Sequence, residues 1–310
     1  MAVALAAYAG DGAVAPYRLL AERDDGTVVR CGEVVAKAHA GDSDPADLAV
    51  RLRIAAHPAL AGVLLAPLRP EPGLVHERPV SLWPYGSPVD PRRPEDAPWE
   101  AAARLLAALH QVPPHLVAAR VPPMRGPAKV ARALHRLDRP DRPSHARAPR
   151  PDADAVRAAA RTLPAWARGA APAPAGGTLC HGDLHLGQLV RLPAGDWRLI
   201  DVDDLGLGAP AWDLARPAAW YAAGILDPGT WLRFLDAYRA AGGPAAGPPG
   251  SDPWSELELP ARALTVQTAA LALAKAAGEG RRLDDVERLM VECCVRMATL
   301  PPDLNPPSAS

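Results

Sequence analysis

The pattern of apolar and polar residues divides the chain into a strand-rich first part and a helix-rich second part. In the first part, short runs of apolar and β-branched residues separated by turn residues predict β-strands. These predicted strands cover residues 17–23, 27–31, 33–39, 61–70 and 73–85. A helix is predicted between the third and fourth strands, because Asp44 suits an N-cap and Pro45 suits the first helical position.

The second part of the chain is dominated by helical patterns. From Trp99, the segment WEAAARLLAALHQV carries apolar residues at i, i+3, i+4 and i+7, which predicts an amphipathic helix with one buried face. Prolines divide residues 120–168 into shorter helices around a loop near 139–152. Further helices are predicted over residues 212–224, 228–242, 256–278 and 283–300. The tail, PPDLNPPSAS, has the composition of a disordered segment.

A short hairpin lies between these helical parts and brings polar residues together. An apolar segment after Gln188, a turn at 193–196 and a second apolar run at 197–200 predict two antiparallel strands. Because a hairpin returns the chain to its start, the loop that carries Asp183 and Gln188 should face Asp201. Carboxylate and amide oxygens are the ligands that Mg²⁺ prefers. These three residues are therefore a candidate metal site.

Composition narrows the class of protein. The chain has 310 residues, of which 49% are hydrophobic and 22% charged, as in an ordinary globular protein. The net charge of −1 gives no overall field that favours nucleic acid or an anionic membrane, and no apolar run is long enough to span a bilayer. The apolar N-terminal run has no basic segment before it, so no signal peptide is predicted. The four cysteines form no CxxC pair or zinc spacing, which indicates a reduced, cytoplasmic setting.

Three motifs carry a resemblance to a known family. They are HGDLHLGQ at 181–188, LIDVDD at 199–204 and APAWDLA at 209–215. Together they resemble the catalytic core of the aminoglycoside phosphotransferase family, small-molecule kinases built on the protein-kinase fold. The template spacing is an aspartate, an amide five positions later and a more distant metal-binding aspartate. The form HGDLHLGQ is also similar to that of maltokinases, bacterial members of the same superfamily.

The resemblance implies a role for each polar residue of the core. Asp183 would accept the proton of a substrate hydroxyl, while Asp201 and Gln188 would bind Mg²⁺. The family more often has asparagine at the position of Gln188, whose side chain is one methylene longer. Supporting roles are implied for His181, which would brace the loop, for Asp203 beside the metal, and for Asp213, which would tie the following helix to the loop. His185 would either approach substrate or phosphate or only pack.

The resemblance also implies nucleotide-binding residues in the first part of the chain. Lys37 ends a strand in VVAK, much like the kinase lysine that binds the α- and β-phosphates. The segment SLWPYGSP at 81–88 resembles the hinge that receives the adenine, where Trp83 and Tyr85 would flank the base or, alternatively, pack between lobes. Two departures stand out: no glycine-rich phosphate loop is visible, and the helix after Asp44 has no glutamate to pair with Lys37.

Without that glutamate, an aspartate is the expected acidic partner of Lys37. Asp47 is the nearest substitute for the missing glutamate, and Asp44 is the alternative. The fold class expected from the resemblance is α+β, a two-lobed protein-kinase-like fold with a small antiparallel β N-lobe and a larger, mainly helical C-lobe. Its expected divisions are residues 1–82 for the N-lobe, 83–88 for the hinge, 89–300 for the C-lobe and 301–310 for the tail.

The function implied is transfer of the γ-phosphate of ATP or GTP to a hydroxyl of a small molecule, with Mg²⁺ as cofactor. The substrate would be an antibiotic, a sugar or amino sugar, or a biosynthetic alcohol, and the enzyme a monomer or homodimer. Two alternatives remain: a degenerate kinase-like nucleotide-binding module, and a metallohydrolase that uses the same histidines and aspartates. Residues 120–168 hold eleven arginines against four aspartates, which is the wrong sign for a polycationic aminoglycoside.

Overall fold

A computed structural model of the chain describes residues 1–10, 12–13, 16–23, 26–138 and 151–299. Asp24 and Asp25, which belong to the turn predicted between the first two strands, most of the loop near 139–152 and the predicted tail lie outside these residues. The chain forms two compact units, each described here by itself. Unit 1 comprises Met1–Met124, Gly177–Gly208 and Ala237–Pro244, and unit 2 comprises Arg125–Gly176, Ala209–Asp236 and Ala245–Ser310.

An antiparallel five-stranded sheet forms one part of unit 1. Its strand order is β1-β2-β3-β5-β4. The strands are β1 (Arg18–Arg23), β2 (Gly26–Cys31), β3 (Val34–Ala38), β4 (Gly73–Val75) and β5 (Arg78–Pro84). On the central strand β3, Lys37 pairs with Val28 of β2 on one side and with Ser81 of β5 on the other. The lysine is therefore held in the middle of the sheet.

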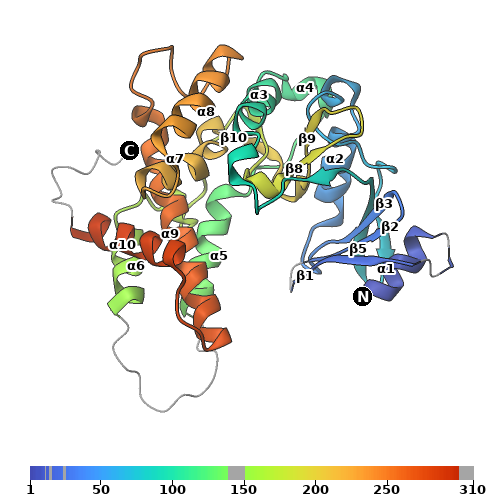
Figure 1. The fold of residues 1–310 in the computed structure, drawn as a ribbon, viewed down its shortest axis with the longest axis horizontal. Coiled ribbons are helices and arrows are strands. Elements are labelled where there is room, and N and C mark those ends of the chain that lie inside the picture. Colours follow the sequence, from blue (N-terminus) through green and yellow to red (C-terminus); the bar gives the residue numbers. More distant parts are fainter. Residues whose placement is uncertain (11, 14–15, 24–25, 139–150, 300–310) are drawn as a thin grey trace. The chain divides into compact units, whose positions relative to one another are not determined.

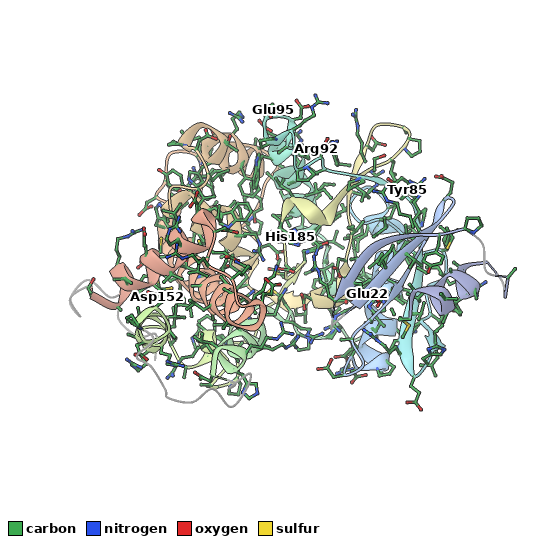
Figure 2. The ribbon with its side chains drawn as sticks, turned by 60° about the horizontal axis from the view of Figure 1, so that its bottom comes forward. Glu22, Tyr85, Arg92, Glu95, Asp152 and His185 are labelled. Carbon is green, nitrogen blue, oxygen red and sulfur yellow. The ribbon has the colours of Figure 1, made fainter. Side chains whose placement is uncertain are left out.

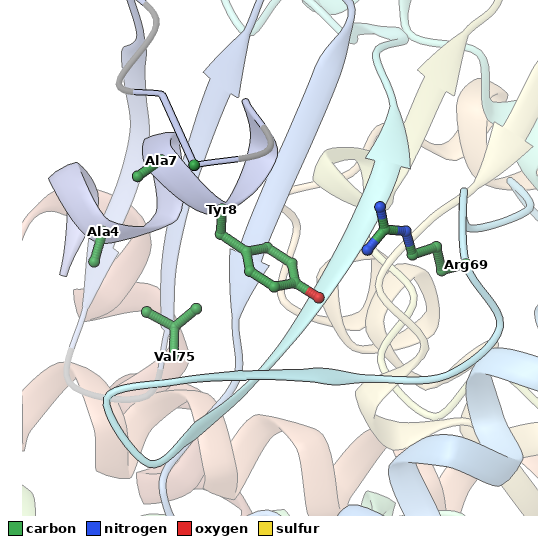
Figure 3. A pocket seen from close by; sticks show the side chains of 6 residues that line it. Ala4, Ala7, Tyr8, Arg69 and Val75 are labelled. Carbon is green, nitrogen blue, oxygen red and sulfur yellow. The ribbon is translucent and has the colours of Figure 1, made fainter.

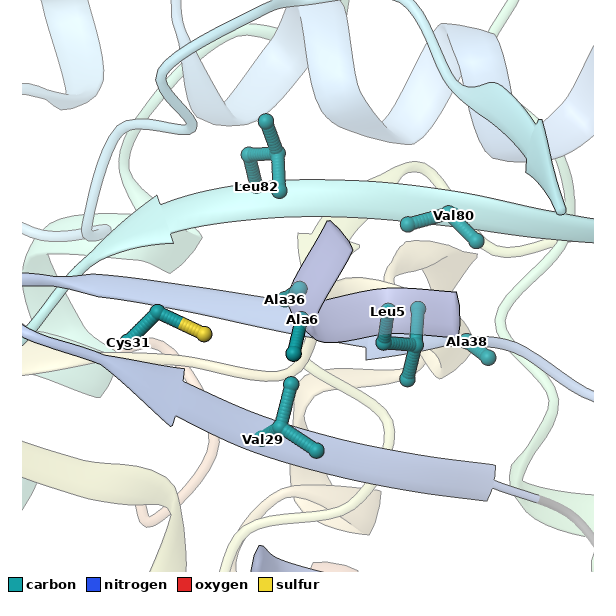
Figure 4. Packing of buried hydrophobic residues seen from close by; sticks show 8 residues of the cluster. All are labelled: Leu5, Ala6, Val29, Cys31, Ala36, Ala38, Val80 and Leu82. Carbon is teal, nitrogen blue, oxygen red and sulfur yellow. The ribbon is translucent and has the colours of Figure 1, made fainter. Parts of the chain in front are cut away.

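Helix α1 (Ala2–Ala9) covers one face of this sheet (Figure 1). Its Leu5 and Ala6 are fully buried in a cluster that the strands complete. Figure 4 shows this cluster, formed by Leu5, Ala6, Val29, Cys31, Ala36, Ala38, Val80 and Leu82. Ala36 and Ala38 belong to the cluster under α1. Because successive residues of a strand point to opposite faces, Lys37 and His39 lie on the face away from α1. Helix α1 was not predicted from sequence.

A hollow open to solvent lies beside α1. Its volume is about 460 Å³, and Figure 3 shows Tyr8 of α1, Arg69 and Val75 around it. Its lining also includes Ala4, Ala7 and Gly12. None of the residues singled out by the sequence motifs lines this hollow, so it is distinct from the candidate site.

Helix α2 (Pro45–Ala55) begins where the sequence predicts. The Asp44 carboxylate accepts hydrogen bonds from the backbone N–H groups of Ala46 at 2.8 Å and Asp47 at 3.3 Å. These are the bonds of an N-cap, which satisfy donors that have no partner within the helix.

The strand predicted at 61–70 is wrong. Residues 58–60 form the 3-10 turn η1 (Pro58–Leu60), and the turns continue to residue 63. Only Leu64 is extended enough to bridge, in parallel, to Leu199. Leu64 and Leu65 are buried inside unit 1. The apolar sequence therefore reflects burial of the segment and not strand pairing.

The remaining elements of unit 1 carry the candidate site. Strands β8 (Leu189–Arg191) and β9 (Trp197–Leu199) form the predicted hairpin, closed by a hydrogen bond from Leu192 N–H to the Asp196 carbonyl. Strand β6 pairs with β8, and β7 pairs with β10. The other elements are β6 (Ser87–Pro88), β7 (Thr178–Cys180), β10 (Gly206–Gly208), η2 (Pro94–Asp96), α3 (Trp99–His110), α4 (Pro114–Val117), η4 (Leu186–Gln188) and η5 (Val202–Asp204).

Unit 2 is helical in its described part. The long helix α9 packs against α5, α6, α7 and α10. The Tyr221 ring stacks on the rings of Trp231 and Trp254, and these two tryptophan rings are tilted by 31° to each other. The elements are α5 (Gly126–Asp138), α6 (Pro151–Arg161), η3 (Trp166–Arg168), η6 (Pro210–Trp212), α7 (Ala215–Ala222), α8 (Pro228–Ala240, which ends in unit 1), α9 (Trp254–Glu279) and α10 (Asp285–Thr299). No helix among the described residues is long and apolar enough to cross a membrane. All four cysteines are buried free thiols.

Candidate active site

Two loops of unit 1 carry the motif residues. The first follows β7 and holds His181, Asp183 and His185, ending in the 3-10 turn that contains Gln188 (His185 is labelled in Figure 2). The hairpin of β8 and β9 then returns the chain, so that Asp201 follows β9 directly. The backbone N–H of Ile200 donates to the Gln188 carbonyl at 2.9 Å, which joins the ends of the two loops.

His181 braces these two loops against each other. The ring is fully buried, and its Nε2 lies 2.8 Å from the Ile200 carbonyl oxygen. A carbonyl only accepts, so Nε2 carries the proton. The other nitrogen, Nδ1, lies 3.4 Å from the backbone N–H of Asp183 and accepts from it. One ring therefore fixes the backbone at Asp183 and at the residue before Asp201.

Asp201 stands where three polar groups meet. Its Oδ1 accepts from Lys37 Nζ at 2.6 Å, across 164 residues of sequence, and its Oδ2 lies 3.2 Å from the Gln188 amide. The backbone of Asp201 is left-handed, with φ of 65°. That conformation costs an L residue about 1–2 kcal/mol, though aspartate tolerates it better than most. Strain of this kind gathers at functional sites.

The oxygens of Gln188 and Asp201 fit an Mg²⁺ ion. Gln188 is 7% exposed, and its amide end and Asp201 Oδ2 are 3.2 Å apart. The oxygen and nitrogen of an amide exchange places by a flip of the group. With the oxygen turned toward Asp201, the spacing approaches the ~3.0 Å between neighbouring ligands of an octahedral ion with bonds of about 2.1 Å. This spacing is compatible with a shared metal ion, and the role of Gln188 as a ligand stays a prediction.

Lys37 and Asp203 hold each other in the charged form. Lys37 Nζ lies 3.0 Å from Asp203 Oδ2 as well as 2.6 Å from Asp201. Burial alone would lower the pKa of Lys37, but the charges of the two aspartates outweigh it and raise that pKa. Burial would likewise raise the pKa of Asp203, but Lys37 and the His39 ring hold it well below its usual range. Both groups are ionised at neutral pH.

His39 is a site residue that the sequence analysis missed. Its ring is 1% exposed, and Nδ1 lies 2.8 Å from Asp203 Oδ1. The sequence signal for it is its position, two residues after Lys37 on the same face of the strand. Its partner is 164 residues away, and no local pattern announces such a contact.

The acidic residues expected to pair with Lys37 from helix α2 lie elsewhere. Asp44 caps the helix, and Asp47 lies 3.4 Å from Arg120. Within the described part of the chain, the ion pairs of Lys37 are with Asp201 and Asp203. The expectation that Asp47 or Asp44 replaces the missing glutamate is therefore wrong.

The two hinge aromatics are already engaged. Trp83 is 7% exposed, and its ring N–H donates to Ser81 Oγ at 2.8 Å. Tyr85 carries the Arg30 guanidinium over its ring, 3.3 Å from the centroid. This placement favours packing roles for both; their contact with a nucleotide base stays a prediction.

The remaining motif residues have local structural contacts. The His185 Nδ1 accepts the backbone N–H of Gly187 at 3.0 Å and so shapes the turn before Gln188. Asp213 is 1% exposed in unit 2, at the end of η6. A role for either in substrate or phosphate binding stays a prediction.

Known proteins are similar to this chain in sequence family and in fold. The model of the phosphotransferase enzyme family matches residues 17–257, whereas no curated protein matches the chain. A choline/ethanolamine kinase family protein from Mesorhizobium loti aligns with a TM-score of 0.60 at 19% identity, covering 96% of this chain and 93% of that one.

Two antibiotic-modifying enzymes have a similar fold. A thermostable mutant of the aminoglycoside phosphotransferase APH(4)-Ia gives a TM-score of 0.58 at 13% identity, with 92% and 94% covered. The spectinomycin phosphotransferase APH(9)-Ia, in complex with ADP and spectinomycin, gives 0.55 at 12%, with 92% and 89% covered. The expected two-lobed, protein-kinase-like α+β fold is thus confirmed. The chain belongs to the phosphotransferase enzyme family and is a small-molecule phosphotransferase.

Proposed function

We propose that this enzyme transfers the γ-phosphate of ATP or GTP to a hydroxyl group of a small molecule and uses Mg²⁺ as its cofactor. The observation that carries the proposal is that Lys37 and Gln188, from two distant parts of the chain, both contact the Asp201 carboxylate, at 2.6 Å and 3.2 Å. A partly buried cation and an amide that share one carboxylate form an arrangement suited to a metal-bound triphosphate.

Asp183 is the proposed proton acceptor. Its backbone is fixed by His181, and the loop that holds it runs directly into Gln188. In the transfer, the acceptor oxygen forms a bond to the γ-phosphorus while the bond from that phosphorus to the β–γ bridging oxygen breaks. The hydroxyl proton passes to the Asp183 carboxylate, and the nucleoside diphosphate leaves with the bridging oxygen.

Lys37, Gln188 and Asp201 are proposed to hold the nucleotide phosphates. Mg²⁺ held by Gln188 and Asp201 would neutralise charge on the β- and γ-phosphates. Lys37 remains cationic at neutral pH because the aspartates beside it raise its pKa. It therefore has a full positive charge to offer an anionic phosphate.

The alternatives receive less support from the site. A metallohydrolase would need His181 as a metal ligand, but both of its ring nitrogens are engaged by backbone groups. A degenerate binding module would need no proton acceptor, yet Asp183 stands on a loop braced at both ends. The complex of the spectinomycin phosphotransferase with ADP supports an adenine nucleotide as co-substrate.

Three acceptor classes follow from the names of proteins with this fold: choline or ethanolamine, aminoglycosides, and spectinomycin. Each carries a hydroxyl group. The motif likeness to maltokinases adds sugars. Small hydroxylated amines, aminocyclitols and sugars are therefore the acceptors to test.

The test is a panel of such acceptors with Mg-ATP and Mg-GTP, read by release of the nucleoside diphosphate. We expect at least one acceptor to raise release above the rate without acceptor. Asp183→Asn should lower that rate by about 10²–10⁴-fold with nucleotide affinity little changed.

Asp196→Asn is the matched control, because Asp196 lies exposed in the turn between β8 and β9. It should retain the parent rate. An Asp183→Asn enzyme as fast as the control would remove Asp183 from the mechanism. Stoichiometric zinc or iron in the purified protein, with no release for any acceptor, would favour the hydrolase instead.

A further inference from the structure

The lysine of a kinase-like site needs a carboxylate that stays with it when the nucleotide binds. Asp201 cannot serve alone, because the proposed metal takes the same side chain. Helix α2 supplies no candidate, since Asp44 caps it and Asp47 lies near Arg120. The partner must therefore come from another element.

Asp203 is placed to be that partner. It lies in η5, two residues after Asp201, and divides its oxygens between two groups of the sheet. Oδ2 is 3.0 Å from Lys37 Nζ, and Oδ1 is 2.8 Å from His39 Nδ1. An ionised carboxylate only accepts, so Nδ1 carries a proton. With both oxygens engaged, Asp203 has its orientation fixed from β3.

His39 is itself held from every side. Its Nε2 lies 2.7 Å from Ser81 Oγ, and that hydroxyl accepts the ring N–H of Trp83 at 2.8 Å. Its backbone N–H donates to the Pro79 carbonyl at 2.9 Å, and its carbonyl accepts from Arg78 Nε at 2.7 Å. A fully buried ring with both nitrogens and both backbone groups engaged is a rigid support.

Helix α2 contacts the same loop with the opposite charge. Arg51, which is 5% exposed, donates from Nε to the Leu205 carbonyl at 2.8 Å and from an outer nitrogen to the Pro123 carbonyl at 3.4 Å. Helix α2 thus contributes a cation that binds the backbone two residues after Asp203. In the kinase pattern, this helix contributes a carboxylate that pairs with the lysine.

We propose that Asp203, oriented by His39, is the permanent counter-charge that positions Lys37, and that it replaces the acidic residue absent from helix α2. The inference rests on the proposed function. It makes His39 and Asp203 positioning residues, which act on the phosphates through Lys37. It also removes the missing helix glutamate as a reason to regard the enzyme as degenerate.

The test uses the small number of lysines in the chain. Lysine labelled with ¹³C at Cε gives three side-chain signals, from Lys37, Lys129 and Lys275, and Lys37→Arg assigns the first. We expect Asp203→Asn to shift the Lys37 signal of the nucleotide-free protein, because the ion pair is lost. Asp47→Asn should leave the signal in place, which separates Asp203 from the helix acid.

His39 provides a second pair of variants that keeps the test decisive if Asp203→Asn does not fold. His39→Ala should shift the Lys37 signal, whereas His39→Asn, whose amide can replace the Nδ1 donor, should restore it in part. With an acceptor in hand, Asp203→Asn and His39→Ala should lower kcat/KM for ATP by about 10–100-fold, as loss of a supporting partner typically does, and His39→Asn should recover part of it.

Two results would overturn the proposal. One is a Lys37 signal that stays in place in both Asp203→Asn and His39→Ala. The other is a Lys37 signal that moves as far in Asp47→Asn as it does in Asp203→Asn. Because the signal is read without nucleotide, it stands even if no acceptor is phosphorylated. Failure of the proposed function and failure of this inference are therefore separate outcomes.

Discussion

Substitution of Gly182 tests the contact between the two catalytic loops. Gly182 has φ of +86°, and a Cβ at this position would lie 2.4 Å from the carbonyl oxygen of Asp204. Left-handed backbone costs an alanine about 1–2 kcal/mol. The loops would also have to separate by at least about 0.6 Å to reach the 3.0 Å that real Cβ contacts respect.

Gly32→Ala is the matched control. Gly32 is also left-handed, with φ of +56°, but a Cβ there meets nothing within 4 Å. Both variants should lose about 1–2 kcal/mol of unfolding free energy in urea, with the larger loss for Gly182→Ala. Only Gly182→Ala displaces the loop of Asp183 from the loop of Asp201.

The difference should appear in turnover. Misplacement of reacting groups by about 1 Å can cost 10²-fold, so we expect Gly182→Ala to lower kcat by about 10–100-fold. Gly32→Ala should remain within about twofold of the parent. Release of ADP with Mg-ATP and the best acceptor measures both. Equal kcat values for the two variants would show that the loops do not touch as described.

Three further predictions concern single side chains. Lys37→Ala should raise the KM for ATP and lower kcat, because the phosphates lose their cation; unchanged constants in steady-state assays would exclude a role for Lys37. Asp44→Ala should cost about 1 kcal/mol of unfolding free energy in urea through the lost N-cap bonds, and no loss would place the start of α2 elsewhere. The hydrogen bonds from Arg281 lower the pKa of Glu287 from 4.5 to about 2. The ion pair therefore stabilises the folded state fully above about pH 4.5, and this stabilisation fades as the pH falls toward 2. The Tm difference between the parent and Glu287→Gln should narrow over that range, and a constant difference would refute the assignment.

The sequence predicts well those elements whose signals are local. The hairpin of β8 and β9 follows from two apolar runs around a turn, and the start of α2 at Pro45 follows from the N-cap Asp44, because capping depends on neighbouring residues. Helix α1 was missed because AVALAAYA has neither a capping residue nor a polar face to give it a period. The apolar run at 61–70 has the pattern of a strand because apolar residues are needed for burial whether or not the backbone pairs with another strand.

The candidate site divides in the same way. The contact between Gln188 and Asp201 could be predicted from sequence because a hairpin joins their loops, and the role of Asp183 stays a prediction. The contacts of Lys37 with Asp203, and of Asp203 with His39, join residues more than 160 positions apart. Only the fold brings such groups together. In the proposed arrangement, the acidic partner of Lys37 comes from the loop after Asp201 and not from helix α2.

A crystal structure with Mg²⁺ and a non-hydrolysable ATP analogue would show whether Gln188 and Asp201 hold the metal. We expect a metal about 2.1 Å from oxygens of both side chains, with Lys37 on the phosphates and still paired with Asp203. A metal bound away from both Gln188 and Asp201, or phosphates remote from Lys37, would contradict this expectation.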